Sequence, residues 1–447
     1  MITGNESVPR IVKKIPGPEA KKIVKKDTRF LTTTTKTAPV AALRGRGPVV
    51  EDVDGNVLLD FAAGIGVLNT GHCHPKVVKA IQDQAGEMMH FAGTDYYYSQ
   101  QSDLAERLDG IVPIKGPTKT FFCNSGAEAN EAAFKFARNH EGRRQFVAFQ
   151  GAFHGRTMGA LSLTASKAIQ QSLSGPTMPG VHHTPFPAPF RNMWGINGYD
   201  EPEELSNRAI DALNFLFQTK LPVEDTAALF WEPIQGEGGY HVPPPMFPKM
   251  LQELCNEHGI LLVADEVQTG FGRTGKWFGS DHFGVEPDIL SIAKAMGSGM
   301  PIGASVVKAD LDFESQGVHS NTYGGNLVAC AGSLASIDVI EEEKLVENSA
   351  ARGDQMHARL TEMMDDHASI GDSRGLGLMR AIDFVDAKGG HHPKMADKVE
   401  ELCWKNGLVV LGCGKSGIRF IPPLNTSAEQ IDGAMDVLAL ALKKAKA

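Results

Sequence analysis

The sequence predicts an α/β fold with a large, mostly parallel sheet flanked by helices and a smaller α+β lobe. The chain has 447 residues, which exceeds what a single hydrophobic core usually supports. From about residue 76 helical and strand patterns alternate, which is typical of a parallel sheet. After about residue 330 long helical stretches alternate with short strands. We therefore expect segments at residues 1–75, 76–333 and 334–447, with the first and last together forming the smaller lobe.

The N-terminal segment is a basic arm followed by a hairpin. Residues 1 to about 46 are polar and basic, and a short helix is predicted after Pro16. In VVEDVDGNVLLDF the turn dipeptide Asp54-Gly55 separates two apolar-rich arms, which predicts a β-hairpin. The motif GHCHP at residues 71–75 has no further ligands at metal-site spacing, so no metal site is predicted there.

Composition limits the class of protein. Hydrophobic residues make up 42% and charged residues 22%, which is ordinary for a soluble globular protein. The net charge of -9 and the lack of a basic block argue against nucleic-acid binding. The six cysteines are scattered, which favours reduced thiols, and no apolar run approaches the roughly 18 residues of a membrane span. We expect a cytoplasmic protein.

Five apolar runs predict the strands of the large sheet, and a polar group follows each run. The runs cover residues 119–123, 145–149, 227–231, 260–264 and 289–293. The groups that follow them are Ser125, Arg156, Glu232, Asp265 and Lys294. In an open α/β sheet, ligands bind at the carboxyl ends of the strands. These five groups therefore predict one ligand site.

Asp265 and Lys294 indicate the chemistry of that site. Burying a carboxylate or an ammonium group costs several kcal/mol unless a partner compensates. An aromatic aldehyde cofactor would satisfy both, because it bonds to Lys294 and presents a protonated ring nitrogen to Asp265, as pyridoxal phosphate does. On these two residues alone, an ordinary buried ion pair is the alternative.

Two of the strand-end motifs fit the same cofactor. Ser125 and Glu128 form a predicted capping box, so a helix begins there, and the amides of Gly126 and Ala127 offer a phosphate seat. A helix cap without a ligand is the alternative.

In QGAFHGRT, Phe153 is placed to stack on a planar ring, with His154 beside it and Arg156 available for a carboxylate. Core packing is the alternative for Phe153. In IRFIPPL, Arg419 lies between Ile418 and Phe420 and requires an acidic partner.

Two glycine-rich motifs suggest other cofactors. GFGRTG at residues 270–275 matches a dinucleotide fingerprint, but the residues after it do not predict the helix that such a site requires. GCGKS at residues 412–416 lacks the first glycine of a phosphate-binding loop. A nicotinamide dehydrogenase would rest on the first motif alone.

The ordered motifs resemble those of a known family. They are NSGAEANEAA, GAFHGRT, EPIQGEGG, DEVQTGFGRTG, IAKAMGSGMPIGA and SNTYGGN. The chain resembles the class III, subgroup II ω-amino acid aminotransferases of the fold type I pyridoxal phosphate enzymes. This group includes 4-aminobutyrate, ornithine and acetylornithine aminotransferases. The resemblance implies a seven-stranded, mostly parallel sheet and a homodimer with shared active sites, and it leaves open whether dimers pair into tetramers.

The resemblance also implies a set of cofactor-binding residues. Lys294 would bond to the cofactor and later carry a proton, and Asp265 would pair with the ring nitrogen. Gln268 would contact the ring hydroxyl. The remaining contacts would come from Ser125, Gly126, Ala127, Phe153, His154, Val267 and, from a second subunit, Thr322.

Substrate choice would rest on charged residues. In the family pattern Arg156 binds a distal carboxylate and Arg419 binds the α-carboxylate of the 2-oxo acid, with Glu237 as the partner of Arg419. The resemblance also implies that Glu232 lies near the cofactor, among the substrate-binding residues. This set favours a ping-pong aminotransferase that uses an ω-amino donor, such as 4-aminobutyrate or ornithine, and 2-oxoglutarate. A racemase or epimerase is the alternative, although a racemase of small apolar amino acids would not need Arg156.

Overall fold

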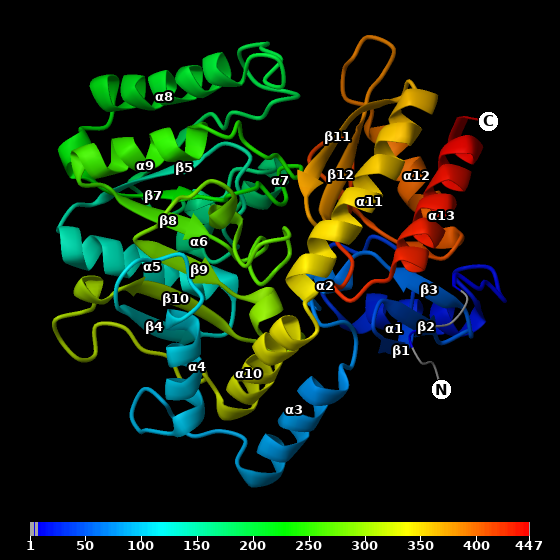
Figure 1. Cartoon of the computed structure of the whole chain (residues 1–447), viewed down its shortest axis with the longest axis horizontal. Helices are drawn as coiled ribbons and strands as arrows, with labels where there is room; N and C mark the ends of the chain where they lie inside the picture. The colour runs from blue at the N-terminus through cyan, green and yellow to red at the C-terminus, as the bar shows by residue number, and fades with distance from the viewer. Residues whose placement is uncertain (1–3, 5–7, 447) are drawn as a thin grey trace.

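The computed structural model describes residue 4 and residues 8–446. Figure 1 shows a region built on a large sheet beside a smaller region that carries both the first helix, α1, and the last, α13. In the described part of the chain, no helix is both long and apolar enough to cross a membrane. We propose boundaries at residues 1–75, 76–333 and 334–447.

The large sheet has seven strands in the order β4-β10-β9-β8-β7-β5-β6. Only β10 runs antiparallel to its neighbours, so the predicted seven-stranded, mostly parallel sheet is confirmed. Because β4 and β9 both oppose β10, they run in the same direction, and the five predicted strands end at one edge. The strands are β4 Thr118–Cys123, β5 Gln145–Phe149, β6 Val181–Thr184, β7 Thr226–Trp231, β8 Leu261–Asp265, β9 Ile289–Ile292 and β10 Gly303–Lys308.

Two strands of this sheet were not predicted. The β6 sequence VHHT contains two histidines and lies in a segment rich in proline and glycine, which predicts an irregular loop. The β10 sequence GASVVK follows a glycine-rich stretch and holds only a short apolar core. Both strands form because the neighbouring strands supply their hydrogen bonds.

Helices cover both faces of the sheet (Figure 1). The central one, α5, presents a small alanine-rich face, including the buried Ala129, Ala132 and Ala133, which lets it approach the strands closely. The helices between residues 63 and 342 are α2 Ala63–Gly66, α3 Pro75–Glu87, α4 Ser99–Asp109, α5 Gly126–Glu141, α6 Met158–Leu163, α7 Ala168–Gln171, α8 Pro202–Thr219, α9 Phe247–His258 and α10 Leu327–Glu342. Short 3-10 turns lie at Val223–Asp225, Gly279–His282, Lys294–Met296 and Ala309–Leu311.

The smaller region contains two four-stranded sheets. One has the order β11-β12-β15-β14, and the other has the order β1-β2-β3-β13. In the second sheet, β13 pairs in parallel with β3 and so joins the C-terminal part to the N-terminal hairpin. The elements are α1 Pro18–Phe30, β1 Ala42–Arg46, β2 Val49–Asp52, β3 Val57–Asp60, α11 Leu345–Asp366, β11 Ile370–Leu376, β12 Met379–Phe384, α12 Pro393–Lys405, β13 Leu408–Val409, β14 Leu411–Cys413, β15 Gly417–Phe420 and α13 Ala428–Lys446.

The predicted N-terminal helix and hairpin both form, and one side chain connects them. Asp54 lies in the hairpin turn, and its carboxylate accepts hydrogen bonds from Glu19 N at 3.1 Å and Ala20 N at 2.9 Å. These amides belong to the first turn of α1, where backbone donors have no partner within the helix. Asp54 therefore caps α1 from a distance in sequence.

Candidate active site

The polar groups predicted at the strand ends meet at one pocket. The cavity has a volume of about 440 Å³ and lies at the carboxyl edge of the large sheet. Most of the predicted site residues line it, namely Ser125, Gly126, Ala127, Phe153, His154, Arg156, Glu232, Asp265, Val267, Gln268 and Lys294. Glu237, Arg419 and Thr322 lie outside this lining.

Lys294 follows β9 and starts a 3-10 turn with φ at +44°, a conformation that is costly for a residue other than glycine. Burial lowers the pKa of its amine, although Asp265 and Glu237 oppose that shift. No carboxylate in the described part of the chain lies within ion-pair distance of Lys294 Nζ, and Asp265 pairs with His154 instead. The alternative of an ordinary Asp265–Lys294 ion pair is therefore wrong.

Asp265 is held at the end of β8 by three hydrogen bonds. Its Oδ2 accepts from Asn130 Nδ2 at 2.8 Å and is 2.7 Å from His154 Nδ1, while its Oδ1 accepts from Val267 N at 3.1 Å. Burial alone lowers the pKa of His154, but the hydrogen bond and the charge of Asp265 outweigh it and raise that pKa overall. The carboxylate is thus fixed in orientation at the pocket wall.

Asn130 is a site residue that the sequence did not reveal. It lies fully buried on the inner face of α5, where its neighbours at helical spacing are glycine, alanine and phenylalanine. A lone amide among buried apolar side chains requires a polar partner. The isolated asparagine is visible in NSGAEANEAA, but its partner Asp265 lies 135 residues further along the chain.

The N-terminus of α5 offers open hydrogen-bond donors. Ser125 Oγ accepts from Glu128 N at 3.2 Å, as predicted, but Glu128 Oε2 accepts from Asn124 N at 2.8 Å rather than from Ser125 N. The predicted capping box is therefore wrong in its second bond. In the described part of the chain, the amides of Gly126 and Ala127 donate to no protein group. Free amides at a helix N-terminus suit a phosphate group.

Glu232 is a buried carboxylate in the same wall. Its oxygens accept from Phe153 N at 3.0 Å and Gly236 N at 3.1 Å. Burial raises the pKa of Glu232 to about 7. Glu232 thereby ties the loop after β5 to the loop after β7, and both loops carry pocket residues.

The two arginines predicted for substrate binding lie in different states. Arg419 Nη1 is 2.6 Å from Glu237 Oε1, so the acidic partner that Arg419 requires is Glu237. Burial raises the pKa of Glu237, but Arg419 outweighs burial and lowers it overall. Arg156 is exposed at the pocket, with its guanidinium carbon 5.9 Å from the Phe153 ring centre, and it forms no ion pair with the described residues.

The loop that carries Glu237 is anchored to the smaller region. Gly414 N donates to Glu237 O at 2.9 Å, and Arg374 Nε donates to Gly239 O at 2.7 Å. The buried guanidinium of Arg374 also pairs with Asp372 at 2.7 Å and with Asp383 at 3.1 Å. The position of Glu237 therefore depends on a buried charge cluster in the sheet of β11 and β12.

Arg374→Met is expected to lower the free energy of unfolding by about 3–5 kcal/mol, because it leaves the buried Asp372 without its cation and leaves Asp383 only the longer pair with Arg191 at 3.8 Å. Urea unfolding of both proteins measures this change. Arg208→Met is the matched control, since Arg208 forms only an exposed pair with Glu204 on α8; there we expect a change within about 0.5 kcal/mol. Equal effects of the two changes would contradict the role given to Arg374.

The residues of the pocket fit pyridoxal phosphate. Lys294 supplies an unpaired amine, Asp265 supplies an oriented carboxylate, and α5 supplies amides without partners. A side chain at Gly126 would place a Cβ 2.7 Å from Val267 Cγ1, so that position stays free of side-chain bulk. When bound, the cofactor supplies a ring that withdraws electrons from the carbon beside the amine.

Comparisons with known proteins agree with this site. A family model for class-III aminotransferases matches residues 31–442. The chain is 40% identical over 444 residues to the alanine/serine racemase of Pyrococcus horikoshii, which covers 97% of this chain and 93% of that protein. It is 42% identical over 416 residues to the acetylornithine aminotransferase of Methanosarcina mazei, which covers 93% of this chain and 95% of that protein.

A solved structure of a PLP-bound amine transaminase from an uncultivated Pseudomonas species aligns with a TM-score of 0.85 and 31% identity. The alignment covers 93% of this chain and 98% of that chain. The fold and the pocket define an enzyme of fold type I that depends on pyridoxal phosphate. The chain belongs to the class III aminotransferases, so the resemblance and the cofactor predicted from the sequence are confirmed.

Proposed function

We propose that this transaminase moves the amino group of an ω-amino acid to 2-oxoglutarate by a ping-pong mechanism. The observation that carries the proposal is the contrast between its two arginines. Among the described residues Arg156 has no ionic partner at the pocket, while Arg419 is paired with Glu237 beside the pocket. Two carboxylate-binding groups in different states suit an enzyme that accepts two different substrates in turn.

In this mechanism each residue has a defined task. Lys294 Nζ would hold the cofactor through its aldehyde carbon and would carry the proton of the reacting carbon. Asp265, held by His154 and Asn130, would keep the cofactor's ring nitrogen protonated. Phe153 and Val267 would orient the ring, and Gln268 would contact its hydroxyl. The amides of Gly126 and Ala127, with the Ser125 cap, would hold the phosphate.

The substrates would use the arginines separately. An ω-amino acid binds its distal carboxylate to Arg156 while Glu237 keeps Arg419 neutralised. The 2-oxo acid then displaces Glu237 and binds its α-carboxylate to Arg419. In neither half-reaction does Arg419 remain buried without an anion, which would cost several kcal/mol.

A donor panel tests this proposal. We would incubate the holoenzyme with 2-oxoglutarate and 4-aminobutyrate, ornithine, acetylornithine or lysine in turn, and measure glutamate. At least one donor should give turnover, and varying both substrates should give parallel reciprocal plots. Turnover only with 2-amino acids that lack a distal amine would overturn the choice of donor.

Arg156→Gln is expected to raise KM for ω-amino acids about 10- to 100-fold, because a charge-assisted hydrogen bond to the carboxylate is lost. The KM for 2-oxoglutarate should change far less, since its α-carboxylate binds Arg419. A monoamine without a carboxylate is the matched control donor. If its KM rose as much as that of 4-aminobutyrate, the assignment of Arg156 would be wrong.

Racemisation or epimerisation is a second candidate activity. The observation that favours it is the 40% identity to an alanine/serine racemase across 97% of this chain. Incubation of one pure enantiomer of alanine or serine, without any 2-oxo acid, tests it. Loss of optical rotation would support racemisation, and a constant rotation would exclude it for those amino acids.

We also propose a homodimer in which Thr322 reaches the phosphate site of the partner. Thr322 is exposed and does not line the pocket of its own chain. It lies within a patch of exposed apolar side chains, which are Met88, Met89, Phe91, Tyr96, Tyr97 and Tyr323. His90 and Tyr323 bring the two parts of the patch together, with ring centres 4.9 Å apart.

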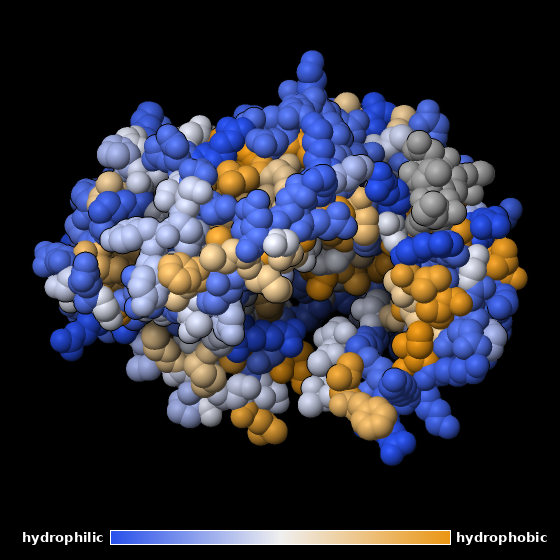
Figure 2. All heavy atoms as spheres, turned by 90° about the horizontal axis from the view of Figure 1, so that it is seen from below, coloured by the Kyte–Doolittle hydropathy of each residue, from blue (hydrophilic) through white to orange (hydrophobic). Residues whose placement is uncertain are grey.

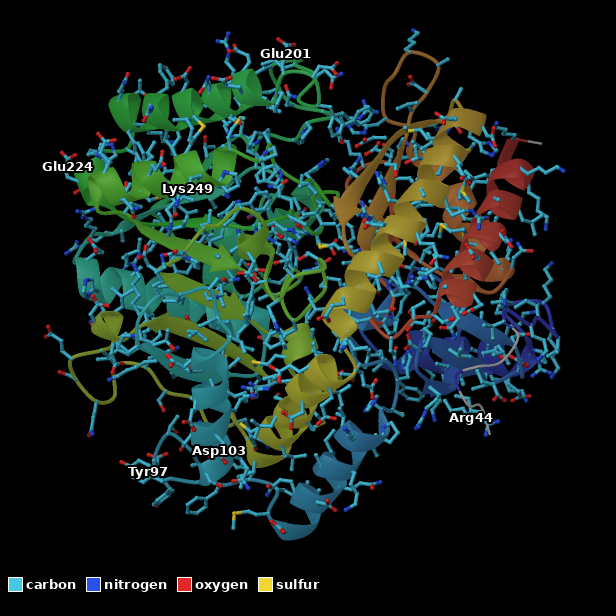
Figure 3. The ribbon with its side chains drawn as sticks, in the orientation of Figure 1. Arg44, Tyr97, Asp103, Glu201, Glu224 and Lys249 are labelled. Atoms are coloured by element: carbon cyan, nitrogen blue, oxygen red, sulfur yellow. The ribbon has the colours of Figure 1, made fainter. Side chains whose placement is uncertain are left out.

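The exposure of Tyr97 supports this surface as an interface. Tyr97 is fully exposed and lies at the edge of the molecule beside α4 (Figure 3). Seen from below, the molecule is hollowed and shows apolar side chains among hydrophilic ones (Figure 2). Sedimentation of the holoenzyme gives the assembly mass, and a monomer at micromolar concentration would contradict the shared site.

A further inference from the structure

Tyr240 lies outside the pocket lining and contacts both Gln268, which lines the pocket, and Arg419. It is fully buried in the loop after Glu237, and its φ of +58° is a left-handed conformation that costs free energy for a tyrosine. Such a conformation persists only where the surroundings determine it. The contacts of the Tyr240 side chain therefore indicate what holds this residue in its left-handed conformation.

The Tyr240 hydroxyl contacts Gln268. It donates a hydrogen bond to Gln268 Oε1 at 2.8 Å. Burial raises the pKa of Tyr240, so the hydroxyl stays protonated and remains a donor. With Oε1 engaged, Nε2 is the end of the amide that donates to no protein group in the described residues, and Gln268 lines the pocket. Gly236 makes room for this nitrogen, since a Cβ there would lie 2.6 Å from it.

The Tyr240 ring contacts the other side of the site. The guanidinium carbon of Arg419 lies 5.9 Å from the ring centre, within the range of a cation–π contact. The Tyr240 ring also packs in an apolar cluster that includes Ile234, Met379 and Ile421. One rigid side chain thus supports both the amide of Gln268 and the guanidinium of Arg419.

We infer that Tyr240 is a positioning residue with two functions. Its hydroxyl orients Gln268 so that the amide N–H faces the cofactor's ring oxygen, and its ring supports the Arg419 guanidinium that receives the 2-oxo acid. This inference rests on the roles proposed above for Gln268 and Arg419. It adds a physical link between the cofactor and the substrate carboxylate.

The first test measures cofactor binding without turnover. Pyridoxamine 5′-phosphate has no aldehyde, so calorimetry with the cofactor-free full chain reports non-covalent contacts alone. Tyr240→Phe keeps the ring and is expected to raise the dissociation constant about three- to tenfold, the effect of one lost hydrogen bond. Ser333→Ala is the control, because it removes another buried hydroxyl, bonded to Ala329 O at 2.8 Å in α10. Its dissociation constant should stay within twofold of the parent value.

A double-mutant cycle separates positioning from a general loss of stability. If Tyr240 acts through Gln268, Tyr240→Phe should have no further effect on the dissociation constant in a Gln268→Ala background. Independent, additive effects of the two changes would overturn the inference. So would a Tyr240→Phe variant that melts at a lower temperature but binds pyridoxamine 5′-phosphate as the parent does.

The second function is tested by removing the ring. Tyr240→Leu should raise KM for 2-oxoglutarate at least fivefold over the value for Tyr240→Phe, while KM for the ω-amino donor changes less than twofold. Equal KM values for 2-oxoglutarate in the two variants would overturn the role of the ring. The binding measurements use no amino donor or acceptor, so a failure of the proposed substrates would leave them interpretable.

Discussion

Lys294→Ala is expected to abolish covalent attachment of pyridoxal phosphate and to lower turnover on the order of 10⁴-fold or more. Lys294 supplies the only amine in the described pocket lining, and this amine forms no ion pair with the described residues. Burial lowers its pKa, which increases the fraction of the neutral, reactive amine near neutral pH. The visible absorption of the purified holoenzyme and the initial rate with the best donor measure the two effects.

Lys115→Ala is the matched control for this change. Lys115 is an exposed lysine paired with Glu286 at 2.6 Å, away from the pocket. Its variant should keep the visible absorption and the rate within about twofold. If Lys294→Ala retained both, the pocket would not be the site of cofactor attachment.

The central parallel strands of the large sheet were predictable because they are buried on both faces. Apolar runs such as LLVAD and ILSI carry that signal without any knowledge of their neighbours. The candidate site followed from topology, since parallel strands bring their carboxyl ends to one edge. Lys294 and Asp265 could therefore be placed together although 28 residues lie between them in the sequence.

Contacts made by loops were not predictable in the same way. Glu237 lies in the loop after β7 of the large sheet, and Arg419 lies in β15 of the smaller region. Their ion pair was predicted from the family resemblance and not from spacing. Tyr240 gave no signal, because a single aromatic residue after GEGG is as consistent with core packing as with a site. The hydrogen bond from Asn130 to Asp265 and the hydrogen bond from Asn124 N to Glu128 depend on side-chain geometry, which residue patterns do not encode.

Asp265→Asn is expected to lower kcat about 10²- to 10⁴-fold. The neutral amide cannot hold a proton at the cofactor's ring nitrogen as a carboxylate does. The change also disturbs the local hydrogen bonds, because Oδ2 accepts from two donors and Oδ1 from a third. An amide places an N–H₂ group against at least one of these donors, which costs about 1–3 kcal/mol of stability.

A variant of the adjacent Glu266 distinguishes the effect of losing charge at the cofactor ring from the effect of losing stability. Glu266 is buried at the end of the same strand, but it accepts from Gly279 N at 2.8 Å and Ser280 N at 2.7 Å and does not line the pocket. Glu266→Gln should lower the free energy of unfolding by a similar amount while kcat per folded enzyme stays within about threefold. In Asp265→Asn alone, the pKa of His154 measured by NMR should fall, because burial is then no longer opposed by the carboxylate. Similar kcat values for the two variants would show that Asp265 acts on stability and not at the ring nitrogen.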